Sequence, residues 1–142
     1  MIDHVYVSVS DPARSLAFYI AALKPLGWRE FVNYDGTSGP DTVPDLWGLT
    51  DGAAASGQTI KTSIWLRQRK VGETGLYLGV AADDPAEVDA AYAAALQAGG
   101  QDDGVPAMRL YFGEGYYAAN VVDFDGNRLE FVNKAWNPKK PV

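Results

Sequence analysis

Apolar and polar side chains alternate at the start of the chain, through residues 2–9. Val5, Val7 and Val9 share one face of this segment, and opposite them lie His4, Tyr6 and Ser8. A period of two residues predicts a β-strand with one buried face. The period then becomes helical, since Asp11-Pro12 forms a helix start and apolar residues recur at Leu16, Tyr19, Ile20 and Leu23. We therefore expect a strand followed by a helix that ends at residues 24–27.

The same pattern of a strand and a helix returns 73 positions along the chain. Nine of the seventeen residues at positions 11–27 are identical to those found 73 positions later, without a gap. Alanines raise this number, but the Asp-Pro start and the final glycine are also shared. The sequence therefore predicts one structural unit used twice. In this register the single histidine, His4, falls opposite Tyr77.

Further alternating segments complete each unit. In the first unit they lie at residues 28–34, 45–49 and 60–69, with a loop at 35–44 and a run of small residues at 51–57. In the second unit they follow a strand at 76–81 and a helix that begins at Pro85 and is closed by Gly99-Gly100, and they lie at 101–105, 116–122 and 128–133. The last two are joined by Asp123-Phe124-Asp125-Gly126-Asn127, a strong hairpin signal.

The order of these segments predicts two β-α-β-β-β modules within a single domain of residues 1–142. The first module spans about residues 1–70 and the second about 75–134. A short linker at 71–75 joins them, and a C-terminal tail follows at 135–142. The prolines and lysines of the tail indicate that it frays.

Composition narrows the classes of function. The chain has a formal net charge of -6 and no cysteine. The acidic balance argues against nucleic acid as a partner, because phosphate binding requires a basic face. The lack of cysteine excludes disulfides, iron–sulfur clusters and thiol catalysis. Since no apolar run approaches the roughly 20 residues that span a bilayer and the first residues lack signal-peptide features, we expect a cytoplasmic protein that does not bind membranes.

The duplicated unit, the histidine in its first strand and the final D-x-D-G-N-x-x-E hairpin together resemble the vicinal oxygen chelate superfamily. That superfamily includes glyoxalase I, the extradiol dioxygenases, and the bleomycin and fosfomycin resistance proteins. The stretch from Tyr116 to Glu130 is similar to the C-terminal part of uncharacterised glyoxalase-like members. The resemblance implies an α+β fold in which eight strands form a curved mixed sheet around a cup-shaped pocket.

In the enzymes of that superfamily, a divalent metal ion lies on the floor of the cup. By the resemblance, His4 matches the ligand of the first strand and Glu130 that of the last strand. The other first-strand position, usually His, is Tyr77, and the candidates for the fourth position are Ser63, Trp65 and Arg67, none of them a usual ligand for a divalent metal. Two of the four expected ligands are therefore present. This incomplete set predicts either a weakly bound divalent ion or none.

Two other roles of His4 and Glu130 require no metal ion. They would then form a hydrogen-bonded pair on the strand face, or a general base that removes a proton next to a carbonyl group. Other residues are candidate ligand-binding side chains of an aromatic-lined cavity: Tyr6, Trp47, Trp65, Arg67, Tyr77, Arg109, Tyr111, Tyr116 and Asn120. Their alternative roles are core packing for the aromatic residues and surface charges for the arginines.

Three hypotheses of function follow. The first is a binder of a small, aromatic or drug-sized molecule whose metal site is incomplete. The second is a lyase, isomerase or dioxygenase of the glyoxalase-like type that depends on a divalent metal and uses His4 and Glu130 as its catalytic residues. The third is a scaffold whose cup is filled by its own side chains. In each case the resemblance implies a homodimer, with the cup either within one chain or shared between two.

Overall fold

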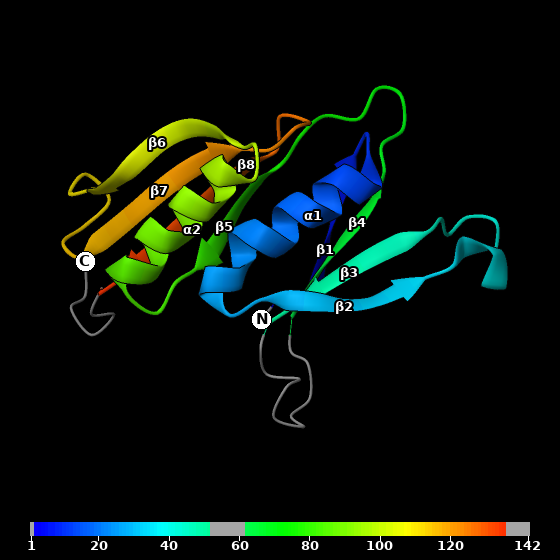
Figure 1. The fold of residues 1–142 in the computed structure, drawn as a ribbon, viewed down its shortest axis with the longest axis horizontal. Helices are drawn as coiled ribbons and strands as arrows, with labels where there is room; N and C mark the ends of the chain where they lie inside the picture. Colours follow the sequence, from blue (N-terminus) through cyan, green and yellow to red (C-terminus); the bar gives the residue numbers. More distant parts are fainter. Residues whose placement is uncertain (1, 52–61, 136–142) are drawn as a thin grey trace.

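The computed structural model of the protein describes residues 2–51 and 62–135. A strand, a helix and three strands follow one another twice along the chain (Figure 1). The first module consists of β1 (His4–Val9), α1 (Pro12–Leu23), the 3-10 helix η1 (Lys24–Leu26), β2 (Arg29–Tyr34), the 3-10 helix η2 (Gly36–Ser38), β3 (Leu46–Thr50) and β4 (Ser63–Gln68). The second module consists of β5 (Tyr77–Ala81), α2 (Pro85–Gln97), β6 (Gln101–Met108), β7 (Tyr116–Val122) and β8 (Arg128–Lys134).

The strands of each module form their own four-stranded mixed sheet. The strand order is β1-β4-β3-β2 in the first sheet and β5-β8-β7-β6 in the second. In both sheets the first strand of the module runs parallel to the last one, and the other neighbours are antiparallel. The predicted α+β fold of two β-α-β-β-β modules is therefore confirmed, with the eight strands divided between two hydrogen-bonded sheets.

The ends of several elements differ from the predicted ones. β1 begins at His4 rather than at Ile2, and β6 extends to Met108 beyond the predicted end at Val105. β6 pairs with β7 through two register shifts, which interrupt the simple alternation on which the prediction relied. Residues 52–57 of the predicted run of small residues, residues 60 and 61 of the predicted fourth strand, and 136–142 of the tail lie outside the described residues.

Both helices begin in the way that their Asp-Pro starts predict. The carboxylate of Asp11 accepts a hydrogen bond of 3.1 Å from the backbone N–H of Arg14. The carboxylate of Asp84 accepts one of 2.8 Å from the N–H of Glu87. Both side chains satisfy donors that the first turn of a helix leaves free, and the proline that follows lacks an N–H that would need a partner. The repeated sequence thus produces the same local structure twice.

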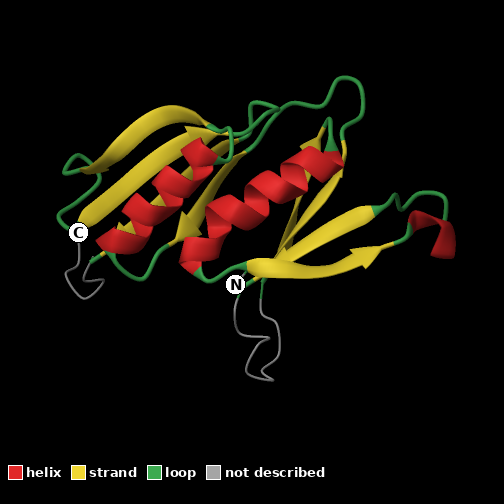
Figure 2. Cartoon of the chain, in the orientation of Figure 1, coloured by secondary structure: helices red, strands yellow, loops and turns green. Residues whose placement is uncertain are grey.

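The two helices lie on the same side of the sheets and pack against each other (Figure 2). A continuous hydrophobic core joins the helices to both sheets, and it extends from Val7 and Val9 in the first module to Leu129 and Phe131 in the second. These residues occupy the helix-facing side of their strands, in agreement with the predicted alternation. The opposite sides of the strands carry several of the residues that the sequence assigned to a cup, among them Tyr77, Asn120 and Glu130.

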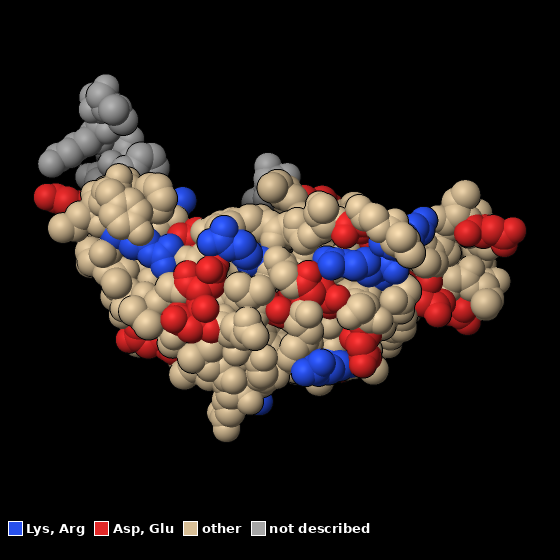
Figure 3. Space-filling view, turned by 90° about the horizontal axis from the view of Figure 1, so that it is seen from above, with Lys and Arg blue, Asp and Glu red and all other residues tan. Residues whose placement is uncertain are grey.

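Charged side chains of both signs are mixed on the surface. On the face seen in Figure 3, lysine and arginine side chains lie among aspartate and glutamate side chains instead of gathering into one patch. Such a mixture creates no extended positive field that would steer a polyanion toward this face. Within the described residues, neither α-helix combines the length and the apolar composition that crossing a membrane requires.

Candidate functional site

The side of the second sheet that points away from the helices collects several of the predicted site residues. The register pairs Asn120 of β7 with Glu130 of β8. Tyr77 lies opposite Arg128 and Tyr116 opposite Lys134, so both tyrosines share the side of Glu130. Arg109 follows β6 and reaches this side through its contact with Glu130. We call these five residues, Tyr77, Arg109, Tyr116, Asn120 and Glu130, the Glu130 face.

Glu130 is a buried carboxylate, with 7% of its surface exposed. Its Oε1 atom accepts hydrogen bonds from Nη1 of Arg109 at 3.2 Å and from the hydroxyl group of Tyr116 at 2.8 Å. Burial and then the hydrogen bond to Glu130 raise the pKa of Tyr116 from its ordinary 10.0 to about 12. Tyr116 therefore remains a hydrogen-bond donor at neutral pH. The negative charge of Glu130 is balanced by the guanidinium group of Arg109.

A second polar pair lies beside this carboxylate. Nδ2 of Asn120 donates a hydrogen bond of 2.9 Å to the hydroxyl oxygen of Tyr77. The guanidinium carbon of Arg128 lies 5.3 Å from the centre of the Tyr77 ring, and Nε of Arg128 contacts Oδ2 of Asp103 at 2.7 Å. Because the oxygen of Tyr77 acts as acceptor toward Asn120, its own proton is available for another acceptor.

An aromatic arm at residues 110–112 borders the Glu130 face. Leu110, Tyr111 and Phe112 are all exposed, and the rings of Tyr111 and Phe112 lie 4.6 Å apart. The ring of Phe112 lies 5.1 Å from that of Tyr116. A groove of about 440 Å³ runs between this arm and the sheet, and it is lined by Tyr77, Asp103, Gly104, Val105, Ala107, Met108, Arg109, Tyr111, Phe112, Asn120 and Arg128.

A second hollow of about 400 Å³ lies on the other side of Glu130. Its walls are formed largely by small or short side chains of β5 and β8, together with Tyr116 and Lys134. Lys134 and Arg128 were not among the predicted site residues, although both lie two or four positions from Glu130 and thus share its side of β8. The alternation along β8 was the signal that would have found them.

In the first module, His4 and Tyr6 lie on the side of β1 that points away from the helices. Nδ1 of His4 contacts Oδ1 of Asp3 at 2.7 Å, and the rings of His4 and Tyr6 lie 5.6 Å apart. The alternative in which His4 bonds to Glu130 is therefore wrong for this chain, since Glu130 is engaged by Arg109 and Tyr116. Asp3 precedes β1, so strand alternation does not decide the side on which it lies.

The remaining predicted residues of the first module are distributed over two sides of the sheet. Nε1 of Trp65 donates to Oγ of Ser63 at 3.0 Å, and Arg67 forms an ion pair with Glu73. Trp47 is different, because it pairs in register with the buried Leu66 and packs against the hydrophobic core. Trp47 is thus separated from the residues around Trp65 by the sheet itself, and the prediction that they share a cavity is corrected.

The donor groups of the chain do not fit the divalent metal site of the resemblance. Among residues 2–51 and 62–135, no three His, Cys, Asp or Glu side chains lie close enough together to hold a metal ion. Oε1 of Glu130 already accepts two hydrogen bonds, and Tyr77 stands where a second histidine was expected. A site with fewer than three strong ligands binds a divalent ion weakly.

Comparison with protein families and solved structures gives a consistent result. Residues 1–131 match the model of the Glyoxalase/Bleomycin resistance protein/Dioxygenase superfamily. The fold is similar to that of a glyoxalase/bleomycin resistance protein from Albidiferax ferrireducens T118, with a TM-score of 0.69 and 25% sequence identity over 93% of this chain and 97% of that chain. Among curated proteins, no sequence matches the chain.

Two further structures share the fold at lower identity. One is a glyoxalase-related enzyme from Fulvimarina pelagi, with a TM-score of 0.66 and 15% identity over 96% of this chain and 91% of that chain. The other is glyoxalase I from Zea mays, with a TM-score of 0.65 and 20% identity over 95% of this chain and 45% of that chain. At these identities the likeness concerns the fold alone.

Proposed function

The chain belongs to the Glyoxalase/Bleomycin resistance protein/Dioxygenase superfamily, and we propose that within it this protein binds a small aromatic molecule on the Glu130 face without a metal ion. The observation that carries the proposal is the contact of Arg109 with Glu130, at 3.2 Å. This internal guanidinium group supplies the positive charge that a metal ion would otherwise bring to the carboxylate. The function is therefore recognition of a ligand in a groove whose charges are already balanced.

The groove offers two kinds of contact to such a ligand. The exposed rings of Tyr111 and Phe112 provide flat apolar surface, and rings of this kind stack or meet edge to face with an aromatic ligand. The hydroxyl proton of Tyr77 provides a hydrogen-bond donor directed by its contact with Asn120. A volume of about 440 Å³ lies within the range of pockets for small molecules. A planar molecule with one acceptor group at its edge satisfies these contacts.

We further propose that the protein forms a homodimer. Tyr6 in the first module and Tyr77 in the second remain about half exposed on the sheet sides that point away from the helices. Half-exposed rings on the uncovered sides of the two sheets favour association with a second copy that covers them. A second copy that covers these sides would also deepen the groove. Sedimentation equilibrium measures the mass directly, and a monomer at concentrations far above those in the ligand experiments would contradict this proposal.

The function is tested with a library of planar aromatic compounds by ligand-observed NMR. Hits are then titrated against the wild type and the double variant Tyr111→Ser/Phe112→Ser. Because two aromatic contacts are removed, we expect roughly tenfold weaker binding in the variant. Val32→Ser, which changes an exposed apolar residue of the first module, serves as the matched control and should bind as the wild type does.

Metal content decides between this proposal and the metal-dependent alternative. Tag-free protein is incubated with Mn, Fe, Ni and Zn salts, freed of excess metal and examined by elemental analysis, with His4→Ala alongside. We expect only traces of metal in both proteins. Close to one equivalent in the wild type that is lost in His4→Ala would establish the metal-dependent lyase, isomerase or dioxygenase instead. If the hits bound equally well to Tyr111→Ser/Phe112→Ser, the proposal that they bind in this groove would also be overturned.

A further inference from the structure

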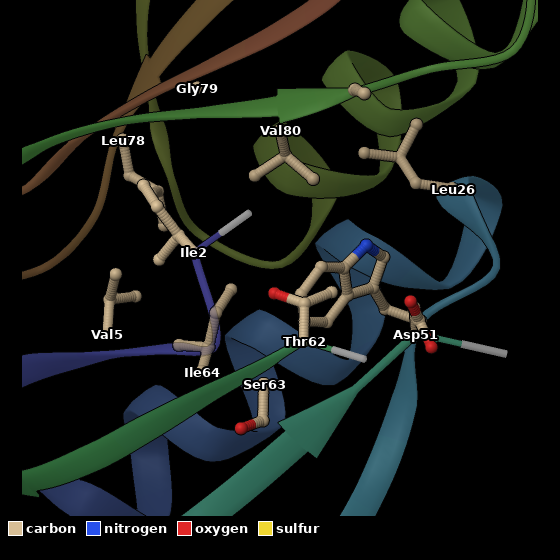
Figure 4. A pocket seen from close by; sticks show the side chains of 12 residues that line it. Ile2, Val5, Leu26, Asp51, Thr62, Ser63, Ile64, Leu78, Gly79 and Val80 are labelled. Carbon is tan, nitrogen blue, oxygen red and sulfur yellow. The ribbon is translucent and has the colours of Figure 1, made fainter. Parts of the chain in front are cut away.

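A cavity of about 360 Å³ lies where the two modules meet (Figure 4). Its walls come from the ends of β1 and β4, from β5, and from the segment between α1 and β2. The lining residues are Ile2, Val5, Leu26, Trp28, Asp51, Thr62, Ser63, Ile64, Leu78, Gly79, Val80 and Ala81. Figure 4 shows Val5 and Ile64 of the first sheet facing Leu78 and Val80 of the second across the cavity.

This cavity is separate from the groove of the Glu130 face. Val5, Ile64, Leu78 and Val80 belong to the side of the strands that packs toward the helices, because all four belong to or pack against the core. Tyr77 and Glu130 occupy the opposite side of β5 and β8. None of the residues that line the groove lines the cavity. β5 therefore lies between the cavity and the groove, although its Gly79 and Ala81 also line the second hollow beside Glu130.

Two polar groups at the cavity lack hydrogen-bond partners among the described residues. The indole N–H of Trp28 donates to no group there, and the hydroxyl group of Thr62 is likewise unpaired, although its backbone carbonyl accepts from Thr50. An unpaired donor that is partly shielded from water gains free energy when a ligand supplies an acceptor. The remaining wall is dominated by aliphatic side chains.

We infer that this cavity binds a small neutral molecule of about two fused rings that carries a carbonyl group. The size follows from the volume, since an apolar cavity of about 150 Å³ already accommodates benzene. The neutral charge follows from the described lining residues, which include no Lys, Arg or His to pair with an anion, while Asp51 already has a partner. The carbonyl group accepts a hydrogen bond from the indole N–H of Trp28, and the aliphatic walls bury the rings.

Two probes that differ by one group test the inference: 1-indanone, which has a carbonyl group, and indane, which lacks it. Each is titrated into ¹⁵N-labelled full-length protein, and the indole N–H signals are followed by two-dimensional NMR, with the signal of Trp28 assigned from Trp28→Phe. We expect 1-indanone to shift the Trp28 signal and to bind roughly threefold more tightly than indane, as one hydrogen bond provides. In Trp28→Phe the two probes should bind with equal affinity.

The variant Leu78→Phe narrows the cavity from the β5 side and should strongly reduce the binding affinity for both probes. If that variant does not fold, the comparison of probes in Trp28→Phe still decides the question. The double variant Tyr111→Ser/Phe112→Ser leaves the cavity intact and should bind both probes as the wild type does. Failure of both probes to shift signals of cavity residues up to their solubility limit would overturn the inference, and so would shifts confined to Tyr77 and Asn120.

Discussion

The hydroxyl group of Tyr19 donates a hydrogen bond of 2.7 Å to Oδ2 of Asp123, a residue 104 positions away. Oδ1 of the same carboxylate accepts from the backbone N–H groups of Asp125 and Asn127, both at 2.8 Å. Oδ2 also accepts from Nδ2 of Asn127 at 2.7 Å. The turn between β7 and β8 is thus shaped by a carboxylate that at the same time anchors α1 of the other module.

The rest of this turn reaches the first module as well. Nδ2 of Asn127 lies 3.3 Å from the carbonyl oxygen of Ser8, and the backbone N–H of Ser10 donates to Oδ1 of Asp125 at 3.0 Å. The guanidinium group of Arg69 donates to the carbonyl oxygen of Asp125 at 3.0 Å. The Asp and Asn positions of the D-x-D-G-N-x-x-E signature therefore fasten the two modules to each other, whereas its final residue, Glu130, belongs to the Glu130 face.

Replacement of Tyr19 by Phe should destabilise the protein by about 1–3 kcal/mol, because the buried carboxylate of Asp123 loses a donor that water does not replace. Unfolding in urea, followed by circular dichroism, measures the change. Tyr92→Phe is the matched control, since the hydroxyl group of Tyr92 donates to Asp102 at an exposed position, and we expect a change within about 0.5 kcal/mol. Equal effects of the two substitutions would show that the Tyr19 contact does not hold the modules together.

Local features of the fold could be predicted from the sequence, whereas the connection between the modules could not. The strands and helices follow from alternation and from the Asp-Pro starts, which act within a few residues. The hairpin at Asp123 to Asn127 was predicted as a turn, and that prediction is confirmed. Its partners Tyr19 and Ser8 lie more than 100 positions away, so no periodicity along the chain connects them.

For the candidate site as well, single strand positions could be predicted from the sequence, but contacts between distant residues could not. The strand at 128–133 was predicted, and in the structure Glu130 lies on the side of β8 opposite to the core residues Leu129 and Phe131. Its partner Arg109 could not be paired with it, because the two register shifts between β6 and β7 decide which residues reach that side. Trp47 was assigned to the wrong side because its orientation depends on the pairing of β3 with β4, in which Gly48 rather than Trp47 lies opposite Trp65.

Gly48→Ala should destabilise the protein by about 1–3 kcal/mol, since overpacking of a filled site has costs of this size. A methyl group on Gly48 would lie 2.7 Å from Cζ3 of Trp65 and 2.8 Å from the carbonyl oxygen of Val32. Gly79→Ala is the control within another strand, because its methyl group would meet no atom closer than 3.9 Å. Thermal unfolding of both variants measures the difference. An unchanged midpoint for Gly48→Ala would mean that the indole ring of Trp65 does not lie over β3.

Stability should fall in alkaline solution partly through Tyr116. The folded state raises the pKa of this hydroxyl group from 10.0 to about 12, so the folded protein keeps a proton that the unfolded chain releases. The contribution of Tyr116 to the free energy of unfolding is therefore fully present below pH 10.0 and is lost as the pH rises toward 12. Urea unfolding over this interval should show a smaller loss for Tyr116→Phe than for the wild type. Tyr111→Phe, at an exposed ring, should follow the wild type.

The ion pair between Arg109 and Glu130 should be strongly coupled, because its side chains are only 12% and 10% exposed. Arg109→Met leaves the carboxylate without its cation and should destabilise the protein by about 3–5 kcal/mol. The same change in a Glu130→Gln background should have a much smaller effect, since no uncompensated charge remains. Urea unfolding of the four proteins yields the coupling free energy of the double-mutant cycle.

A second cycle on Arg128 and Asp103 provides the comparison. This pair is closer, at 2.7 Å, but its side chains are 53% and 26% exposed. We expect a coupling of about 0.2–1 kcal/mol for it, because water screens exposed charges. If the Arg109 and Glu130 cycle gave a value as small as this one, the guanidinium group would not be balancing a buried carboxylate. Glu130 would then be free to bind a different cation. This result would support the metal-dependent alternative.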